Sequence, residues 1–181
     1  MRKGAGKEKG SSFERTVARL FDSYWNVPKN TFWRTPLSGG WHEVGDVAPR
    51  DRSIWFPFII ECKSYKTLDL LQLLTRMKTT KLYKWWEQVS KDAEKAKGTQ
   101  RDPSTCKRLL IIKINYMPIL CVYSPEELPF GSLTLEDDCR KQFRVFLGNE
   151  QIVLCLFSTF QQRFSQEYLD KFCNKNYIEK V

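Results

Sequence analysis

Glu61 and Lys63 are the residues whose types and spacing could support chemistry, because they close an apolar run at residues 56–60. In a β-strand, residues i and i+2 point to the same face, so this acid and this base would lie side by side. Cys62 would point to the opposite, packed face. Charged side chains at the end of a buried strand are costly unless they have partners or a task. The pair therefore predicts a site with a chemical role.

A second acid, Asp46, follows Gly45 and could approach this pair from the preceding segment. Two carboxylates and the Cys62 backbone carbonyl would offer the hard oxygen ligands that Mg²⁺ prefers, with positions left for water. Lys63 could orient or deprotonate one of those waters, or neutralise a developing phosphate charge. Together these parts predict a phosphodiester hydrolase.

Each of these residues also has a plainer interpretation. Glu61 and Lys63 could form a surface ion pair on an edge strand, although the preceding apolar run is typical of a buried strand. Asp46 could merely cap the turn before Pro49. His42 is the only histidine. A general base is one possible role for it, but a loop histidine more often contacts backbone or DNA.

Length and charge restrict the class of protein. The chain has 181 residues, 41% of them hydrophobic, which is enough for one domain with a real core. Its net charge of +9 favours a polyanionic partner, with nucleic acid ahead of a membrane surface. No apolar stretch approaches the ~20 residues that span a bilayer. The charged N-terminus lacks the apolar segment of a secretion signal, so we expect a protein of the cell interior that is not secreted.

Six cysteines are distributed along the chain, at positions 62, 106, 121, 139, 155 and 173. No two of them have the C-x-x-C spacing of a zinc site, and a single histidine cannot complete one. Cys62, Cys121 and Cys155 lie in apolar runs, as small buried hydrophobic residues do. The pattern predicts free thiols and a reducing compartment.

Hydrophobic periodicity predicts a mixed α/β core. A first helix is expected from about Ser11 to Tyr24, a helical region at 68–74 and a longer helix at 81–97. The expected strands are residues 31–36, 44–48, 54–63, 109–114 and 118–123. A hairpin about Gly148 (strands 143–147 and 152–157) and a helix at 158–172 would follow. We therefore expect a flexible basic arm (1–10), a core (11–123) and a C-terminal extension of unknown role (124–181).

Four motifs in this order resemble those of the PD-(D/E)xK nuclease superfamily, and within it the archaeal-type and phage Holliday-junction resolvases. They are Lys-Gly-Ser-Ser-Phe-Glu-Arg (9–15), Arg-Thr-Pro-Leu-Ser-Gly-Gly (34–40), Gly-Asp (45–46) and Ile-Glu-Cys-Lys (60–63). The resemblance covers residues 9–123. It departs from the family at Gly45, where the family has proline, and in the long stretch between Lys63 and Gln88.

The resemblance implies a restriction-endonuclease-like core, a mixed sheet flanked by helices, that cleaves branched four-way DNA junctions as a homodimer with Mg²⁺ or Mn²⁺. It implies catalytic roles for Glu14, Asp46, Glu61 and Lys63, with Glu14 at a second metal or an outer-shell water. DNA contacts are implied for Arg15, Arg34, Ser38, Gly39, Gly40 and Gln88. Trp41, in the same glycine loop, could contact DNA or pack in the core. Arg76, Lys78, Lys81 and Lys84 could follow phosphates or be plain solvated charges.

Other functions stay open at this point. The chain could be another nuclease of the superfamily, acting in restriction, repair or branched-DNA processing. It could also be a non-catalytic DNA-binding module of the same fold, although the intact acids and lysine argue against a decayed site. The apolar run at 152–157 and the final helix are candidates for the dimer interface or for packing beside it. We expect neither a membrane partner nor a small-molecule cofactor.

Overall fold

The computed structural model describes residues 5–35, 44–51, 53–68, 80–98, 106–128 and 142–169. Its helices are α1 (Ala5–Tyr24), α2 (Lys81–Gly98) and α4 (Phe157–Arg163). Its strands are β1 (Phe32–Arg34), β2 (Val47–Pro49), β3 (Phe58–Tyr65), β4 (Lys107–Ile114), β5 (Leu120–Tyr123), β6 (Gln142–Leu147) and β7 (Glu150–Leu156).

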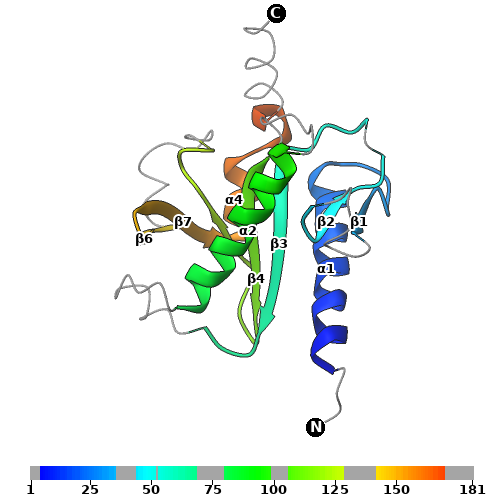
Figure 1. Ribbon diagram of the computed structural model, residues 1–181. Coiled ribbons are helices and arrows are strands. Elements are labelled where there is room, and N and C mark those ends of the chain that lie inside the picture. Colours follow the sequence, from blue (N-terminus) through cyan, green and yellow to red (C-terminus); the bar gives the residue numbers. More distant parts are fainter. Residues whose placement is uncertain are drawn as a thin grey trace, which may run out of the picture.

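One mixed sheet of seven strands runs through the molecule in the order β1-β2-β3-β4-β5-β7-β6. Only β3 and β4 are parallel among the neighbouring pairs of described strands, and α2 lies between them in the chain. A parallel pair needs such a crossover, whereas the antiparallel pairs can be joined by short turns. The expected α/β fold with a central mixed sheet flanked by helices is confirmed (Figure 1).

Helices cover both faces of this sheet. Phe58 and Ile60 of β3 pack in the cluster that includes α1 and α4, whereas Ile59 packs in the cluster that includes α2. The same alternation divides Leu109 from Leu110 on β4. Because alternate residues point to opposite faces, a strand covered on both sides must be apolar at nearly every position. This explains the continuous apolar runs in the sequence.

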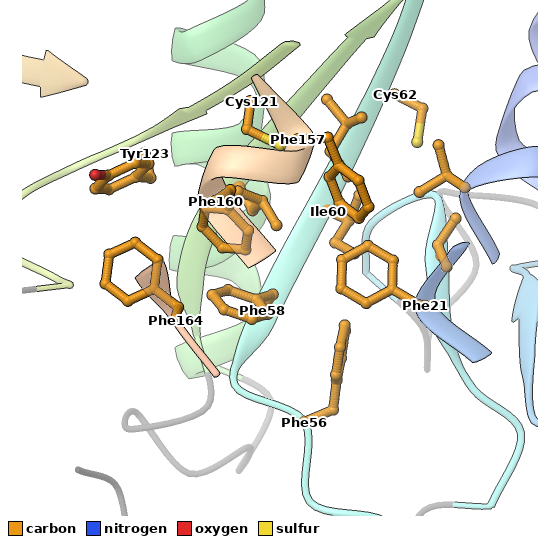
Figure 2. Close-up of a cluster of buried hydrophobic side chains, with 14 of the residues drawn as sticks. Phe21, Phe56, Phe58, Ile60, Cys62, Cys121, Tyr123, Phe157, Phe160 and Phe164 are labelled. Carbon is orange, nitrogen blue, oxygen red and sulfur yellow. The ribbon is translucent and has the colours of Figure 1, made fainter. Parts of the chain in front are cut away.

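Aromatic side chains fill the face between the sheet, α1 and α4 (Figure 2). The Phe21 ring of α1 lies 5.5 Å from the Phe56 ring and 5.8 Å from the Phe157 ring, both nearly edge to face. Phe160 of α4 in turn contacts Phe58 at 5.8 Å. Such pairs stabilise beyond their buried area, so α4 belongs to the main core.

The first helix begins earlier than the sequence pattern predicts. It begins at Ala5, so residues 5–10 are helical where a flexible arm was expected. Ser11 does not cap the helix, because its hydroxyl donates to the Glu8 carbonyl one turn back at 3.1 Å. The Lys9 ammonium also donates to Asn115 Oδ1 at 3.1 Å, which ties this turn to the end of β4.

The C-terminal segment forms the hairpin that was predicted, with Leu147 paired to Glu150 around Gly148. Strand β7 then pairs with β5, so this hairpin extends the core sheet. Ile152 to Cys155 are buried in that sheet, so these side chains pack within the chain and do not themselves present a surface for a dimer. Helix α4 ends at Arg163 and the chain is helical again at residues 166–169, so the helix expected at 158–172 is interrupted at 164–165, while residues 170–172 lie outside the described part.

The long central strand begins at Phe58, later than expected, because Pro57 has no N–H to donate to a ladder. The Pro57 carbonyl still accepts from Lys107 N–H at 2.8 Å, where β4 begins. Strand β2 starts at Val47, so Asp46 lies just before it. Cys62, Cys121 and Cys155 are buried and form no disulfide, as predicted, and Cys106 is buried as well. The helical region expected at 68–74 falls almost wholly outside the described residues. None of the described helices is both long and apolar enough for a membrane span.

Candidate active site

Glu61 and Lys63 lie on the face of β3 that α2 covers. The Lys63 ammonium donates to Glu61 Oε1 and, at 2.9 Å, to Gln88 Oε1 of α2. Glu61 is 4% exposed, and β3 lies between β2 and β4 in the sheet. A solvated ion pair on an edge strand is therefore excluded. The strand periodicity correctly predicted the pair, and Gln88 is the side chain that orients the lysine.

Asp46 is held beside this pair by both its backbone and its side chain. Its N–H donates to the Ile60 carbonyl at 2.7 Å, and its own carbonyl accepts from Thr35 N–H at 3.0 Å. Its Oδ2 accepts from Cys62 N–H at 2.8 Å. The Asp46 carboxylate thus accepts a hydrogen bond from β3 and does not cap the turn before Pro49. These three contacts fix Asp46 between β1 and the central strand.

Gly45 occupies the position where the nucleases that the motifs resemble have proline. It has a φ of 91°, a conformation that proline, with φ near −65°, cannot adopt. A Cβ at this position would lie 2.9 Å from the Ile60 carbonyl oxygen. The chain therefore approaches β3 too closely for a side chain, and this approach brings Asp46 against the strand.

Electrostatics disfavour the ionised forms of the two carboxylates. Burial raises the pKa of Glu61 above its usual range, and the charge of Asp46 raises it further against the opposing effect of Lys63. Burial likewise raises the pKa of Asp46, although the hydrogen bond from Cys62 N–H lowers it in part. Desolvation and like charge both penalise the ionised forms. A bound cation would relieve that penalty.

The donor set fits a hard divalent ion. Cys62 N–H points toward Asp46, and the N–H and C=O of one strand residue face the same edge, so the Cys62 carbonyl also faces this acid. Two carboxylates and one carbonyl leave coordination positions for water, as Mg²⁺ requires. Within the described residues, no group of three or more His, Cys, Asp or Glu side chains is arranged to hold a metal. The predicted set therefore depends on the backbone oxygen.

Glu14 and Arg34 form an ion pair between α1 and β1. Glu14 has only 15% of its side chain exposed, so it is not an ordinary solvated helix acid. It is close enough to raise the pKa of Asp46 through its charge. Arg15, the next residue on α1, is exposed. The structure thus brings Glu14 near the other three residues, although its carboxylate is engaged by Arg34.

Sequence reasoning missed Asp92 of α2. Its charge raises the pKa of both Asp46 and Glu61. The signal that could have found it was helical spacing, because Asp92 follows Gln88 by four residues and so shares its face. Two of the four basic residues that could follow phosphates, Lys81 and Lys84, lie on α2. The other expected residues, Ser38, Gly39, Gly40, Trp41, His42, Arg76 and Lys78, lie outside the described part of the chain.

A comparison with protein-family models matches residues 5–171 to the family described as phage putative PDDEXK endonuclease. The match includes every residue of the site just described and continues through β6, β7 and α4. No curated protein and no solved structure gives a match.

Proposed function

The chain belongs to this phage PDDEXK endonuclease family, since the match spans most of its length, and from this premise we propose a metal-dependent, structure-selective DNA endonuclease. Its substrate is a four-way (Holliday) junction, which it resolves by paired nicks. The ordered motifs from Lys9 to Lys63 support this substrate, because they resemble those of archaeal-type and phage resolvases. The cell interior, in a bacterial host, is where such a substrate occurs.

One observation carries the nuclease assignment. Two acids with raised pKa values, the buried Glu61 and the half-buried Asp46, lie beside a lysine whose ammonium is held by Glu61 and Gln88. Strongly perturbed carboxyls with a cationic neighbour are more frequent at functional sites than elsewhere. A protein that only bound DNA would have no use for such a costly arrangement.

Asp46, Glu61 and the Cys62 carbonyl would hold Mg²⁺, for which Mn²⁺ could substitute. The ion would activate a water and neutralise charge on the scissile phosphate. Lys63 would hold that attacking water and donate to oxygens that gain charge in the transition state. Gln88 restricts the lysine to this orientation. Glu14 would serve a second ion or an outer-shell water once Arg34 releases it.

The test is cleavage of a four-way junction, a flap and a plain duplex side by side, each with Mg²⁺, Mn²⁺ or EDTA. Symmetrical nicks in the junction, abolished by EDTA, are expected. Asp46→Asn is the matched inactive control, because the amide oxygen can still accept from Cys62 N–H while the ligand charge is lost. Its junction affinity should stay near normal, since binding depends on phosphate contacts elsewhere.

Two outcomes would contradict the proposal. Cleavage by Asp46→Asn at the wild-type rate would exclude this metal site. Equal cleavage of all three substrates would favour the second candidate, a PD-(D/E)xK nuclease of restriction or repair type, and would reject the junction as the specific substrate.

A further inference from the structure

A hollow of about 590 Å³ is lined by residues of α1 and β1, by Asn30 and by Arg50 at the end of β2. Four of its lining side chains are arginines, Arg15, Arg19, Arg34 and Arg50, and its lining contains no acid. We propose that this hollow is a phosphate-binding pocket that holds the DNA strand beside the cleavage site. The proposal deepens the nuclease function and rests on it for the identity of the polyanion.

Helical spacing builds one wall of the pocket. Ser12, Arg15 and Arg19 follow one another at intervals of three and four residues on α1, so they share one face. Phe13 and Val17 on the adjoining face are buried in the core and fix the rotation of the helix. Both arginines are exposed, and their guanidinium groups therefore stay hydrated and accessible to a ligand.

The opposite wall contains an arginine that stacks on a tryptophan ring and a loop that a buried carboxylate holds in place. The guanidinium of Arg50 lies 4.8 Å from the centre of the Trp33 ring, within the range of a cation–π contact. The carboxylate of the buried Asp22 accepts from Asn30 N–H and from Phe32 N–H, both at 2.8 Å. These contacts hold the rim of the pocket in place without using any of its arginines.

The four arginines carry more positive charge than the two neighbouring acids, Glu14 and Asp22, can balance. Arg15, Arg19 and Arg50 form no ion pair with any residue that the structure describes, and only Arg34 has one, to Glu14. Three guanidinium groups around one concave surface repel one another unless an anion binds. Arginine presents several donors in a planar fork that suits phosphate oxygens, so the anion of choice is a phosphate group.

Sheet register connects the pocket to the candidate metal site. Arg34 of β1 is opposite Val47 of β2, and Val47 directly follows Asp46. Arg34 also binds Glu14, whose charge acts on Asp46. A strand whose scissile phosphate lay at Asp46 and Glu61 would therefore present a neighbouring phosphate to the arginines. Binding at Arg34 would also compete with its pairing to Glu14.

The experiment measures DNA binding at several salt concentrations in an Asp46→Asn background with EDTA, so that no cleavage interferes. Arg19→Gln/Arg50→Gln is compared with Lys91→Gln/Lys97→Gln, which removes the same charge from exposed lysines of α2. Those lysines form ion pairs on the surface with Glu87 and Glu94, and losing such pairs costs little. Thermal melting of both variants checks that the fold is intact.

We expect the pocket variant alone to bind about tenfold or more weakly. Its salt slope should be smaller by roughly 0.9 for each duplex phosphate that the variant no longer neutralises. Equal affinities and equal slopes for the two variants would overturn the proposal, as would failure of the parent protein to bind DNA. The binding measurement does not depend on catalysis. If the wild-type protein failed to cleave DNA, that failure would reject the nuclease function without affecting the binding result.

Three DNA substrates then distinguish the source of the phosphate. One duplex carries 5′-phosphate ends, one carries 5′-hydroxyl ends, and one is closed at both ends by hairpins. A loss of affinity confined to the phosphorylated ends assigns the pocket to a terminal phosphate. An equal loss on all three assigns it to internal phosphodiesters.

Discussion

Lys63 is restricted from two sides, because its ammonium donates to Glu61 on its own strand and to Gln88 on α2. Its role predicts that Lys63→Ala lowers the single-turnover cleavage rate about 10²–10³-fold, the usual loss for a preorganised donor in the transition state. Metal affinity should change far less than the rate. Lys97→Ala, an exposed lysine paired with Glu94 on the surface, is the matched control and should be active. A decrease of less than about threefold for Lys63→Ala would reject the role.

Gly45 has a different task, since it allows the chain to approach the central strand. Gly45→Ala should destabilise the fold by roughly 1–3 kcal/mol, because alanine must adopt a strained positive φ against the Ile60 carbonyl. It should also slow cleavage by displacing Asp46. Gly10→Ala is the opposite case, because a Cβ there meets only Glu14 Oε1 at 3.8 Å within a helix. Chemical denaturation should find Gly10→Ala about 0.5–1 kcal/mol more stable. Equal effects of the two substitutions would contradict this reasoning.

At the scale of the elements, the hairpin and α4 are essential parts of the core. Arg108 of β4 donates to Glu127 and to both carboxylate oxygens of Glu150, and its guanidinium lies 4.7 Å from the centre of the Trp86 ring. Trp86 Nε1 also donates to Glu150 at 2.9 Å. Truncation after Ser124 would leave this half-buried arginine without either acid, a costly loss for a desolvated charge. It would also expose the apolar edge of β5.

We therefore expect the chain truncated after Ser124 to lack a cooperative thermal transition, whereas the full chain unfolds cooperatively. Circular dichroism during heating measures both, with the full chain as the control. A truncated chain that melts cooperatively near the temperature of the full chain would mean that residues 11–123 fold as a separate unit after all.

Local periodicity predicted those elements that local sequence determines. The i, i+2 spacing of Glu61 and Lys63 gave the correct face of β3, and the hairpin about Gly148 formed as expected. The pairing of β7 with β5 is a long-range contact that no local pattern records, so the C-terminal segment was interpreted as an extension. The arginine pocket was missed for the same reason, because Arg19 and Arg50 come together only when α1 packs beside β1.

At the scale of the whole molecule, paired nicks in a junction require two active sites, whereas one chain carries one. A two-fold dimer is the commonest closed assembly and would supply both. The buried run of β7 cannot form its interface. The outer strand β6 is a better candidate, because Phe143 and Phe146 are 70% and 41% exposed and lie on opposite faces of the strand. Apolar residues on an outer strand favour pairing with another chain.

We therefore predict that light scattering at micromolar concentration, with or without a junction, detects a dimer that Phe143→Lys weakens roughly tenfold or more. The expected loss follows from the ~1.5–3 kcal/mol gained when a phenylalanine side chain is buried. Because Phe143 is exposed, its replacement should leave the melting temperature of the monomer unchanged. Lys97→Ala, far along the chain on α2, is the control and should dimerise normally. A dimer unaffected by Phe143→Lys would reject β6 as the interface, and a monomer in both conditions would reject the assembly that paired nicking requires.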